Sequence, residues 1–310
     1  MRIMILGAGF QGTLYGVRLA RAGHDVTLIA RRQRARELRQ QGAVTQDALS
    51  GRIETVQLPV IERLTPELRA DLCVVTIRRE QISEVLPDLV AAIAVRRIVV
   101  MVNHANGSAN LIEALGRARV VLAFPGAAGS VEAGVVQFVE VNEQSTAVEA
   151  SAHDVVKLFR GAGFRVARVR DMDSWLRRHA VFVTAIAGAI YQAGGYAKSL
   201  AEKPECVRTF ILAVREGWAA LDRNGVKSAP LALRAILSWV PLPFAVGYWR
   251  RLLRSDRGEL YFARHARHAP AEMAALAADV RAMLDEVPVP CLEKLYSAIS
   301  KVAQLPPPKA

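Results

Sequence analysis

The sequence predicts an α/β domain with a doubly wound, mostly parallel sheet, followed by an all-α C-terminal domain. Two observations lead to this fold class. In the first half, short β-branched apolar runs alternate with segments of helical periodicity, which is typical of βαβ units. From Asp171 onward, alanine, leucine and arginine dominate with helical periodicity, and extended β-branched runs disappear. We therefore expect domains at 1–169 and 170–304, followed by a loose tail at 305–310.

Each element of the first domain is predicted from its residue pattern. Apolar runs bounded by turn residues predict strands, and segments with apolar residues three and four apart predict helices. The expected strands are 2–6, 25–30, 71–77, 97–102, 119–124, 135–141 and 164–169, with helices at 10–22 and about 145–161 among their connections.

The composition limits the classes of function. The chain has 310 residues, of which 52% are hydrophobic and 23% charged, so it is expected to bury a sizeable core. Its formal net charge of +12 could serve an anionic ligand, nucleic acid or a membrane surface. Because no helix-turn-helix, zinc finger or aromatic-interleaved basic stretch is present, nucleic-acid binding is not expected. The three cysteines form no CxxC pair, which favours a reducing, cytoplasmic compartment.

The segment 229–249 is rich in apolar and aromatic residues. Arg234 interrupts it, and Pro241 and Pro243 would break a spanning helix, so a transmembrane segment is not expected. The main interpretation is a buried helix, turn and helix. The alternative is a hydrophobic patch that contacts a membrane or forms a homodimer.

Three glycines follow the first apolar run, in the sequence MRIMILGAGFQG. They lie between an expected strand and helix, and a second strand follows within ~30 residues, which is the context of a dinucleotide-binding Rossmann domain. Gly7 permits the tight turn, Gly9 lets the backbone approach a pyrophosphate, and Gly12 lets the helix pack closely. The N–H groups at the helix start would hold the phosphates. The expected cofactor-binding residues of this loop are Gly7, Ala8, Gly9, Phe10, Gln11 and Gly12.

The end of the second strand indicates which dinucleotide binds. An NAD site usually has an acidic residue there, which accepts hydrogen bonds from the ribose 2′-hydroxyl. Here the chain reads IARRQRARELR, with Arg31 and Arg32 at that place. A guanidinium group matches a 2′-phosphate, so the sequence favours NADP(H), with Arg31 as the main contact. Arg36 and Arg39 fit a solvated helix face instead.

Four motifs resemble the ketopantoate reductase family, in which a Rossmann domain precedes a helical domain like that of 6-phosphogluconate dehydrogenase. They are GAGFQG with Arg31 after the second strand, VVTIRREQ (74–81), MVNHANG (101–107) and SWLRRH (174–179). The likeness covers the whole chain in layout, and its motifs lie mainly in the first half. It implies reduction of a 2-oxo acid, with hydride transfer at the cleft between the domains.

Arg78 and Asn103 follow expected strands at the carboxyl edge of the sheet, where ligands bind in open α/β folds. Arg78 stands where the family often has lysine, which implies contact with a phosphate or a substrate carboxylate. The alternative is an ordinary surface arginine. Asn103 offers an amide to the nicotinamide ribose or the substrate, and a turn-forming asparagine is its alternative. His104 and Asn106 share that loop as weaker candidates.

The resemblance implies a general-acid lysine shortly after the domain boundary, with asparagines one and two turns later. This chain has no lysine between Lys157 and Lys198, and the helix DSWLRRHAVFVTAIAGAIYQAGG contains no asparagine. His179 is the candidate replacement acid, because imidazole can donate a proton near neutral pH. A hydrogen-bonded core histidine is the alternative. Arg177 could orient a carboxylate but hardly deprotonates.

The residues one and two turns beyond His179 are Val183 and Ala187. They predict a more apolar pocket than that of the family, and therefore a bulkier or less polar substrate.

Near the C-terminus, Pro270 is expected to start a helix with Glu272 in its first turn, where any helix favours a carboxylate. The resemblance implies a substrate-binding glutamate near this position, so Glu272 is a candidate and Glu259 its rival. A metal site formed by His265, His268 and Glu272 would need a continuous helix, which Pro270 interrupts. No metal is therefore expected.

The leading hypothesis is an NADPH-dependent reductase of a 2-oxo acid or related small-molecule carbonyl compound, with ketopantoate as one candidate substrate. In it His179 is the acid, and Asn103, Arg78 and Glu272 position the substrate. The missing lysine and asparagines motivate an alternative, a regulatory or scaffold protein that binds NADP(H) without turnover. A third hypothesis keeps the enzyme but attaches it to a membrane through 229–249.

Overall fold

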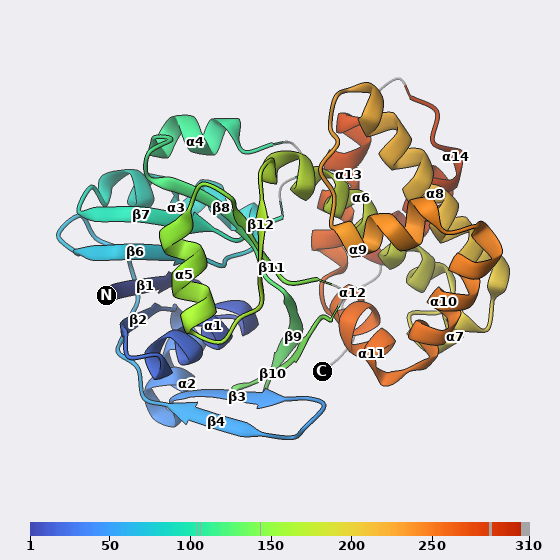
Figure 1. The fold of residues 1–310 in the computed structure, drawn as a ribbon. Coiled ribbons are helices and arrows are strands. Elements are labelled where there is room, and N and C mark those ends of the chain that lie inside the picture. Colours follow the sequence, from blue (N-terminus) through green and yellow to red (C-terminus); the bar gives the residue numbers. More distant parts are fainter. Residues whose placement is uncertain (104, 106, 143, 285–286, 305–310) are drawn as a thin grey trace. The chain divides into compact units, whose positions relative to one another are not determined.

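The computed structural model describes residues 1–103, 105, 107–142, 144–284 and 287–304. Within these residues the chain divides into two compact units (Figure 1). The first unit contains 1–103 and 108–172, and the second contains the chain from Asp173 onward together with Ala105 and Gly107. The expected tail at 305–310 lies outside the described residues.

An eight-stranded sheet forms the centre of the first unit, with the order β12-β11-β8-β7-β6-β1-β2-β5. From β5 to β8 all neighbours are parallel, in the order 3-2-1-4-5-6 of a Rossmann sheet, which confirms the predicted fold class. The strands are β1 (Arg2–Leu6), β2 (Asp25–Ile29), β5 (Val60–Ile61), β6 (Ala70–Val75), β7 (Val95–Val100), β8 (Val120–Phe124), β11 (Thr146–Glu149) and β12 (Val166–Val169).

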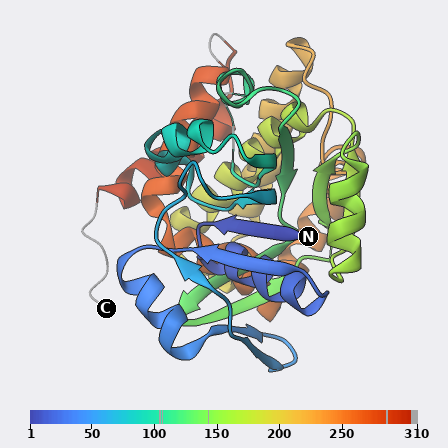
Figure 2. The ribbon, with the colours of Figure 1, turned by 90° about the vertical axis from the view of Figure 1, so that its left-hand side faces the viewer.

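Helices connect the parallel strands and lie on both sides of the sheet (Figure 2). The central strands are consequently buried on both faces, as Ile5, Cys73 and Val99 illustrate with no exposed surface. Burial also raises the pKa of the Cys73 thiol to about 12, so Cys73 behaves as a small buried hydrophobic residue. The helices are α1 (Phe10–Arg21), α2 (Arg32–Gln41), α3 (Ile82–Ala91), α4 (Ala109–Leu115) and α5 (His153–Gly161), and a 3-10 turn, η1 (Arg79–Gln81), precedes α3.

A second, four-stranded sheet follows the order β4-β3-β10-β9 and was not predicted. Its strands are β3 (Ala43–Asp47), β4 (Ile53–Val56), β9 (Ala127–Glu132) and β10 (Val135–Glu140). The segment 135–141 was expected to continue the parallel series, and that expectation was wrong. It forms a strand, but β10 pairs with β9 and β3 instead of joining the main sheet. Helix α1 contacts strands of both sheets, which ties the small sheet to the Rossmann core (Figure 1).

The helix expected at about 145–161 was wrong in its first part. Thr146–Glu149 forms β11, which pairs with β8 and β12, and α5 begins only at His153. Thr146 and Val148 are buried in this pairing, and both are β-branched residues that suit a strand. Tertiary pairing therefore overrides the helical character of the neighbouring alanines and glutamates.

Among the described residues of the second unit, all regular secondary structure is helical, which confirms the predicted all-α domain. Its core contains the large buried rings of Phe210, Trp218 and Trp249. The helices are α6 (Met172–Gln192), α7 (Ala197–Ala201), α8 (Pro204–Arg223), α9 (Leu231–Arg234), α10 (Leu242–Arg254), α11 (Asp256–Gly258), α12 (Arg264–His268), α13 (Pro270–Met283) and α14 (Pro290–Ala303), with π-helical turns η2 (Ala235–Trp239) and η3 (Glu259–Ala263).

The apolar segment 229–249 forms α9, the turn η2 and the start of α10, so the predicted helix, turn and helix is present. Its burial is only partial. Leu237 and Trp249 lie in the core, whereas Leu231, Trp239 and Phe244 are between 61% and 73% exposed. No helix among the described residues has both the length and the apolar composition needed to cross a membrane.

Candidate functional site

The glycine loop joins β1 to α1 and leaves no room for side chains at two of its positions. A Cβ atom added to Gly12 would lie 1.9 Å from the backbone oxygen of Gly7 and 2.6 Å from Oγ1 of Thr76. Gly7 has φ of +99°, a conformation that glycine adopts without strain, and a Cβ there would approach Ile77 to 2.7 Å. Close contact between the loop, α1 and the end of β6 thus requires glycine at both positions.

The third glycine faces open space and fits a dinucleotide pyrophosphate. A Cβ added to Gly9 would meet no described atom within 4 Å, so this side of the loop is accessible to a ligand. Gly9 is the N-cap of α1, and the first intrahelical bond runs from the Thr13 amide to the Gly9 oxygen at 3.0 Å. The amides of Phe10, Gln11 and Gly12 therefore precede the first helical hydrogen bond, as in anion sites at helix N-termini.

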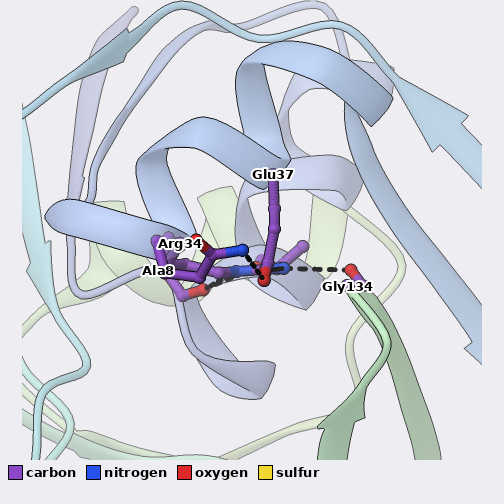
Figure 3. Close-up of polar contacts among 6 residues, drawn as sticks. Ala8, Arg34, Glu37 and Gly134 are labelled. Atoms are coloured by element: carbon purple, nitrogen blue, oxygen red, sulfur yellow. Dashed lines mark hydrogen bonds and ion pairs between the residues drawn. The ribbon is translucent and has the colours of Figure 1, made fainter.

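Arg34 links the glycine loop to neighbouring segments of the first unit through hydrogen bonds (Figure 3). Its Nε donates to the backbone oxygen of Ala8 at 2.8 Å, Nη2 donates to Oγ1 of Thr13 at 3.1 Å, and Nη1 donates to the backbone oxygen of Gly134 at 2.9 Å. Glu37 accepts a further bond from Nη1 at 3.2 Å. Among the five arginines between positions 31 and 39, Arg34 therefore has a structural role, which sequence reasoning missed because the run looks uniformly basic.

A second side chain, Thr76, directly follows β6 and donates from its Oγ1 to the backbone oxygen of Gly7 at 2.6 Å. The loop is thus held by two side chains, Arg34 of α2 and Thr76 after β6. Such preorganisation reduces the ordering that a bound pyrophosphate would require.

Arg31 and Arg32 lie where the sequence predicts them, directly beyond β2 at the start of α2. Arg31 is the N-cap of α2, and its Nη1 forms an ion pair with Oε1 of Glu84 on α3. Arg32 has φ of +51°, which is uncommon for a residue with a side chain and often marks a functional turn. Arg36 is exposed, as predicted, while the exposed Arg39 also pairs with Glu62 at 2.9 Å.

Arg78 and Asn103 both lie beyond the carboxyl ends of strands in the main sheet. Arg78 is exposed, and its backbone N–H donates to Oε1 of Gln81 at 3.1 Å. Asn103 is half-buried three residues beyond the end of β7. Because β1, β6 and β7 are parallel neighbours, both residues belong to the same edge as the glycine loop. His104 and Asn106 lie outside the described residues.

In the second unit, His179 is buried within an aromatic cluster on α6. Its ring stacks on Trp175 with centroids 5.0 Å apart and lies 6.0 Å from the ring of Phe182. Burial lowers the pKa of His179 to about 3, so the imidazole is neutral at pH 7. One turn later Val183 is half-buried, and Ala187 is buried.

The adjacent arginines of SWLRRH differ in environment. Arg177 is partly exposed and pairs with Asp173 one turn earlier, at 3.1 Å. Arg178 points into the core, where only 2% of its side chain is exposed. Its guanidinium donates to the backbone oxygen of Val226, at 2.9 Å from Nε and 2.6 Å from Nη2, and also pairs with Asp222. Sequence reasoning missed Arg178, which fastens α6 to the end of α8.

The two candidate glutamates also have different partners. Glu272 is in the first turn of α13, as predicted, and is half-buried. Burial raises the pKa of Tyr191 on α6, and the nearby Glu272 carboxylate raises it further. Glu259 instead accepts a hydrogen bond from the Ala197 amide at 3.0 Å and pairs with Arg267, a role in holding the start of α7. Among the described residues no group of histidine, cysteine or acidic side chains could hold a metal ion.

Comparisons with known proteins agree with this architecture. The sequence profile of the family described as "Ketopantoate reductase PanE/ApbA" matches residues 3–176, more than half of the chain. A D-mandelate dehydrogenase in complex with NADH and anilino(oxo)acetate is similar in fold, with a TM-score of 0.75 and 15% identity over 98% of both chains. The ketopantoate reductase family member from Ralstonia eutropha JMP134 gives a TM-score of 0.70 and 21% identity, again over 98% of both chains. The 2-dehydropantoate 2-reductase from Geobacter metallireducens GS-15 gives 0.75 and 15%, over 97% of this chain and 100% of that one.

Proposed function

Because the chain belongs to the ketopantoate reductase family, we propose that it is an NADPH-dependent oxidoreductase that reduces a 2-oxo acid or a related carbonyl compound. The observation that carries the proposal is the glycine loop, whose open Gly9 and helix N-terminus suit a pyrophosphate. A bound nicotinamide would supply the hydride for the carbonyl carbon. The residues of the chain bind and orient cofactor and substrate.

The proposed preference for NADPH rests on Arg31. The position that carries a carboxylate in typical NAD sites has an arginine here, whose side chain is 46% exposed. A 2′-phosphate would gain a charge-assisted hydrogen bond from this group, whereas a 2′-hydroxyl gains less. The D-mandelate dehydrogenase of similar fold was solved with NADH.

Replacing Arg31 with aspartate is expected to weaken NADPH binding about tenfold or more and to reverse the preference toward NADH, because a carboxylate repels the 2′-phosphate. Fluorescence titration with each cofactor would measure both dissociation constants. Arg36→Asp is a matched control, since this exposed residue on the same helix undergoes the same change of charge. Unchanged NADPH affinity in Arg31→Asp would remove the argument for NADP(H).

For the substrate we propose a 2-oxo acid with an apolar or aromatic side chain. The family lysine and asparagines are missing from α6, and apolar Val183 and Ala187 follow His179 at helical spacing. The relative that was solved with anilino(oxo)acetate also points to a ligand of this kind. Asn103, Arg78 and Glu272 are the residues that we propose to contact the substrate.

We further propose that His179 assists reduction in its neutral form. Its lowered pKa excludes an imidazolium at pH 7, so the neutral ring would donate an N–H hydrogen bond to the carbonyl oxygen as negative charge develops there. The proton that completes the alcohol then comes from water or through the same imidazole.

A His179→Ala variant is expected to lose about a hundredfold in kcat while its affinity for NADPH stays unchanged, since the role lies in the chemical step. NADPH oxidation with a panel of 2-oxo acids would measure it, beside His268→Ala, which removes an exposed histidine. The pH profile of the wild type is expected to show no ionisation of His179 between pH 6 and 8, because its pKa is about 3. Full turnover in His179→Ala would contradict this role.

The missing lysine also favours a second candidate function, a regulatory or scaffold protein that binds NADP(H) without turnover. This alternative predicts cofactor binding without carbonyl-dependent NADPH oxidation for every 2-oxo acid in the panel. Oxidation of NADPH that depends on one of the 2-oxo acids would exclude it.

A cytoplasmic location is proposed as well. Cys73, Cys206 and Cys291 are all free thiols, which fits a reducing compartment. Fractionation of cells that produce the protein would test the location directly.

A further inference from the structure

The ion pair between Arg31 and Glu84 spans the carboxyl edge of the sheet above β1. Strands β2 and β6 are the two neighbours of β1, and all three run parallel. Arg31 follows β2, and Glu84 lies in the first turn of α3, in the connection that follows β6. Neighbouring strands are about 4.8 Å apart, so β2 and β6, which lie on either side of β1, are roughly 10 Å apart. The ion pair bridges the segments that follow these two strands. The glycine loop extends from β1 between them.

The pair belongs to a wider set of contacts along α3. Asp88, one turn beyond Glu84, receives two hydrogen bonds from Arg63, at 2.8 Å from Nη2 and 3.1 Å from Nε. The bonded Arg63 lowers the pKa of Asp88, and Arg31 contributes to the same shift through its charge. Arg31 therefore faces carboxylates on α3, and Glu84 is the one that contacts it.

Because both side chains of the pair are exposed, a ligand can replace Glu84 as the partner of Arg31. The side chains of Arg31 and Glu84 are 46% and 60% exposed, and an ion pair of this kind contributes at most about 1 kcal/mol. A phosphate dianion is a stronger partner for a guanidinium than a single carboxylate, so it can displace Glu84. A hydroxyl cannot displace it, but it can donate a hydrogen bond to the carboxylate.

We infer that Glu84 is a specificity-determining residue of the nucleotide site, which competes with a ligand 2′-phosphate for Arg31 and accepts a hydrogen bond from a ligand 2′-hydroxyl. Glu84 thereby supplies, from α3, the carboxylate that the end of β2 lacks. The consequence is a protein that discriminates between NADPH and NADH less than Arg31 alone would dictate. The inference rests on the proposed function only in locating the adenosine ribose beside Arg31.

Binding of two nucleotide fragments would test the competition. Adenosine 2′,5′-bisphosphate and AMP differ only in the 2′-phosphate, and neither needs the nicotinamide part of the site. Titration calorimetry is expected to show that Glu84→Gln binds the bisphosphate about two- to fivefold more tightly than the wild type. AMP is expected to bind this variant more weakly, because the neutral amide of glutamine is a weaker hydrogen-bond acceptor for its 2′-hydroxyl than the carboxylate.

Two further variants separate the inference from a general charge effect. Glu113→Gln, on α4, removes the same charge from an exposed position elsewhere in the first unit and is expected to change neither affinity. In an Arg31→Ala background, Glu84→Gln is expected to lose its effect on the bisphosphate. An unchanged ratio of the two affinities in Glu84→Gln, or an equal shift in Glu113→Gln, would overturn the inference. Failure of the wild type to bind NADPH or NADH would instead contradict the proposed function.

Discussion

A Gly12→Ala variant is expected to lose dinucleotide binding and to be destabilised by about 3 kcal/mol or more. The added methyl group would lie 1.9 Å from the Gly7 oxygen and 2.6 Å from Oγ1 of Thr76. The oxygen belongs to the backbone of the glycine loop and cannot move without displacing the loop from α1. Thermal denaturation would measure the loss of stability, and NADPH titration the loss of binding. A variant with the melting temperature and affinity of the wild type would contradict the close packing described for this loop.

Gly9→Ala is the matched control for this substitution. A methyl group at Gly9 meets no described atom within 4 Å, and the backbone there has φ of −70°, which alanine adopts readily. The variant is therefore expected to fold with a melting temperature close to that of the wild type. Its cofactor affinity should nevertheless fall, because the methyl group occupies the space through which a pyrophosphate approaches the backbone. The two alanine variants thus separate folding from ligand binding at the same loop.

Replacing Arg178 with methionine is expected to destabilise the second unit by about 3 kcal/mol. Methionine fills much of the volume but cannot donate to the backbone oxygen of Val226, which accepts two hydrogen bonds from the guanidinium. A buried acceptor without a donor is unfavourable. Asp222 adds little to the effect, because it is 52% exposed and can be solvated without its partner.

Urea denaturation followed by tryptophan fluorescence would measure this effect selectively. All four tryptophans of the chain lie in the second unit, at positions 175, 218, 239 and 249. Arg177→Met is the matched control, since the neighbouring arginine has a partly exposed ion pair within one helix, worth about 0.5 kcal/mol. Equal destabilisation by the two substitutions would show that the buried contacts of Arg178 are not its main contribution.

Local patterns were sufficient to predict the elements of the Rossmann core. The strands at Arg2–Leu6 and Asp25–Ile29, and α1 between them, follow from hydrophobic periodicity and from glycine spacing, which act over a few residues. The small sheet could not be predicted in this way. β3 pairs with β10 from a distant part of the chain, and β9 contains two alanines and a glycine in six residues, a weak signal for a strand.

The residues of the candidate site also differ in whether local sequence patterns can predict their roles. The glycine loop and the place of Arg31 were predictable, because both depend on spacing from the end of a strand. The roles of Arg34 and Glu84 depend on partners elsewhere in the first unit, so no local pattern distinguishes them from other charged residues. Arg177 and Arg178 show the same limit. Successive residues point about 100° apart around a helix, and only the packing of α6 determines which of the two is buried.

The hydrogen bond from Arg34 to Gly134 has a consequence for the order of events during synthesis. It joins residues 100 positions apart, and its acceptor lies in the turn between β9 and β10. The hydrogen bonds by which Arg34 holds the glycine loop are therefore incomplete until the ribosome has produced the chain beyond Gly134. At typical elongation rates this takes about 5 to 20 seconds after Arg34 has been added. The segment that carries the cofactor motif is thus among the first to be made, but we expect it to become competent to capture a dinucleotide only after most of the first unit has emerged.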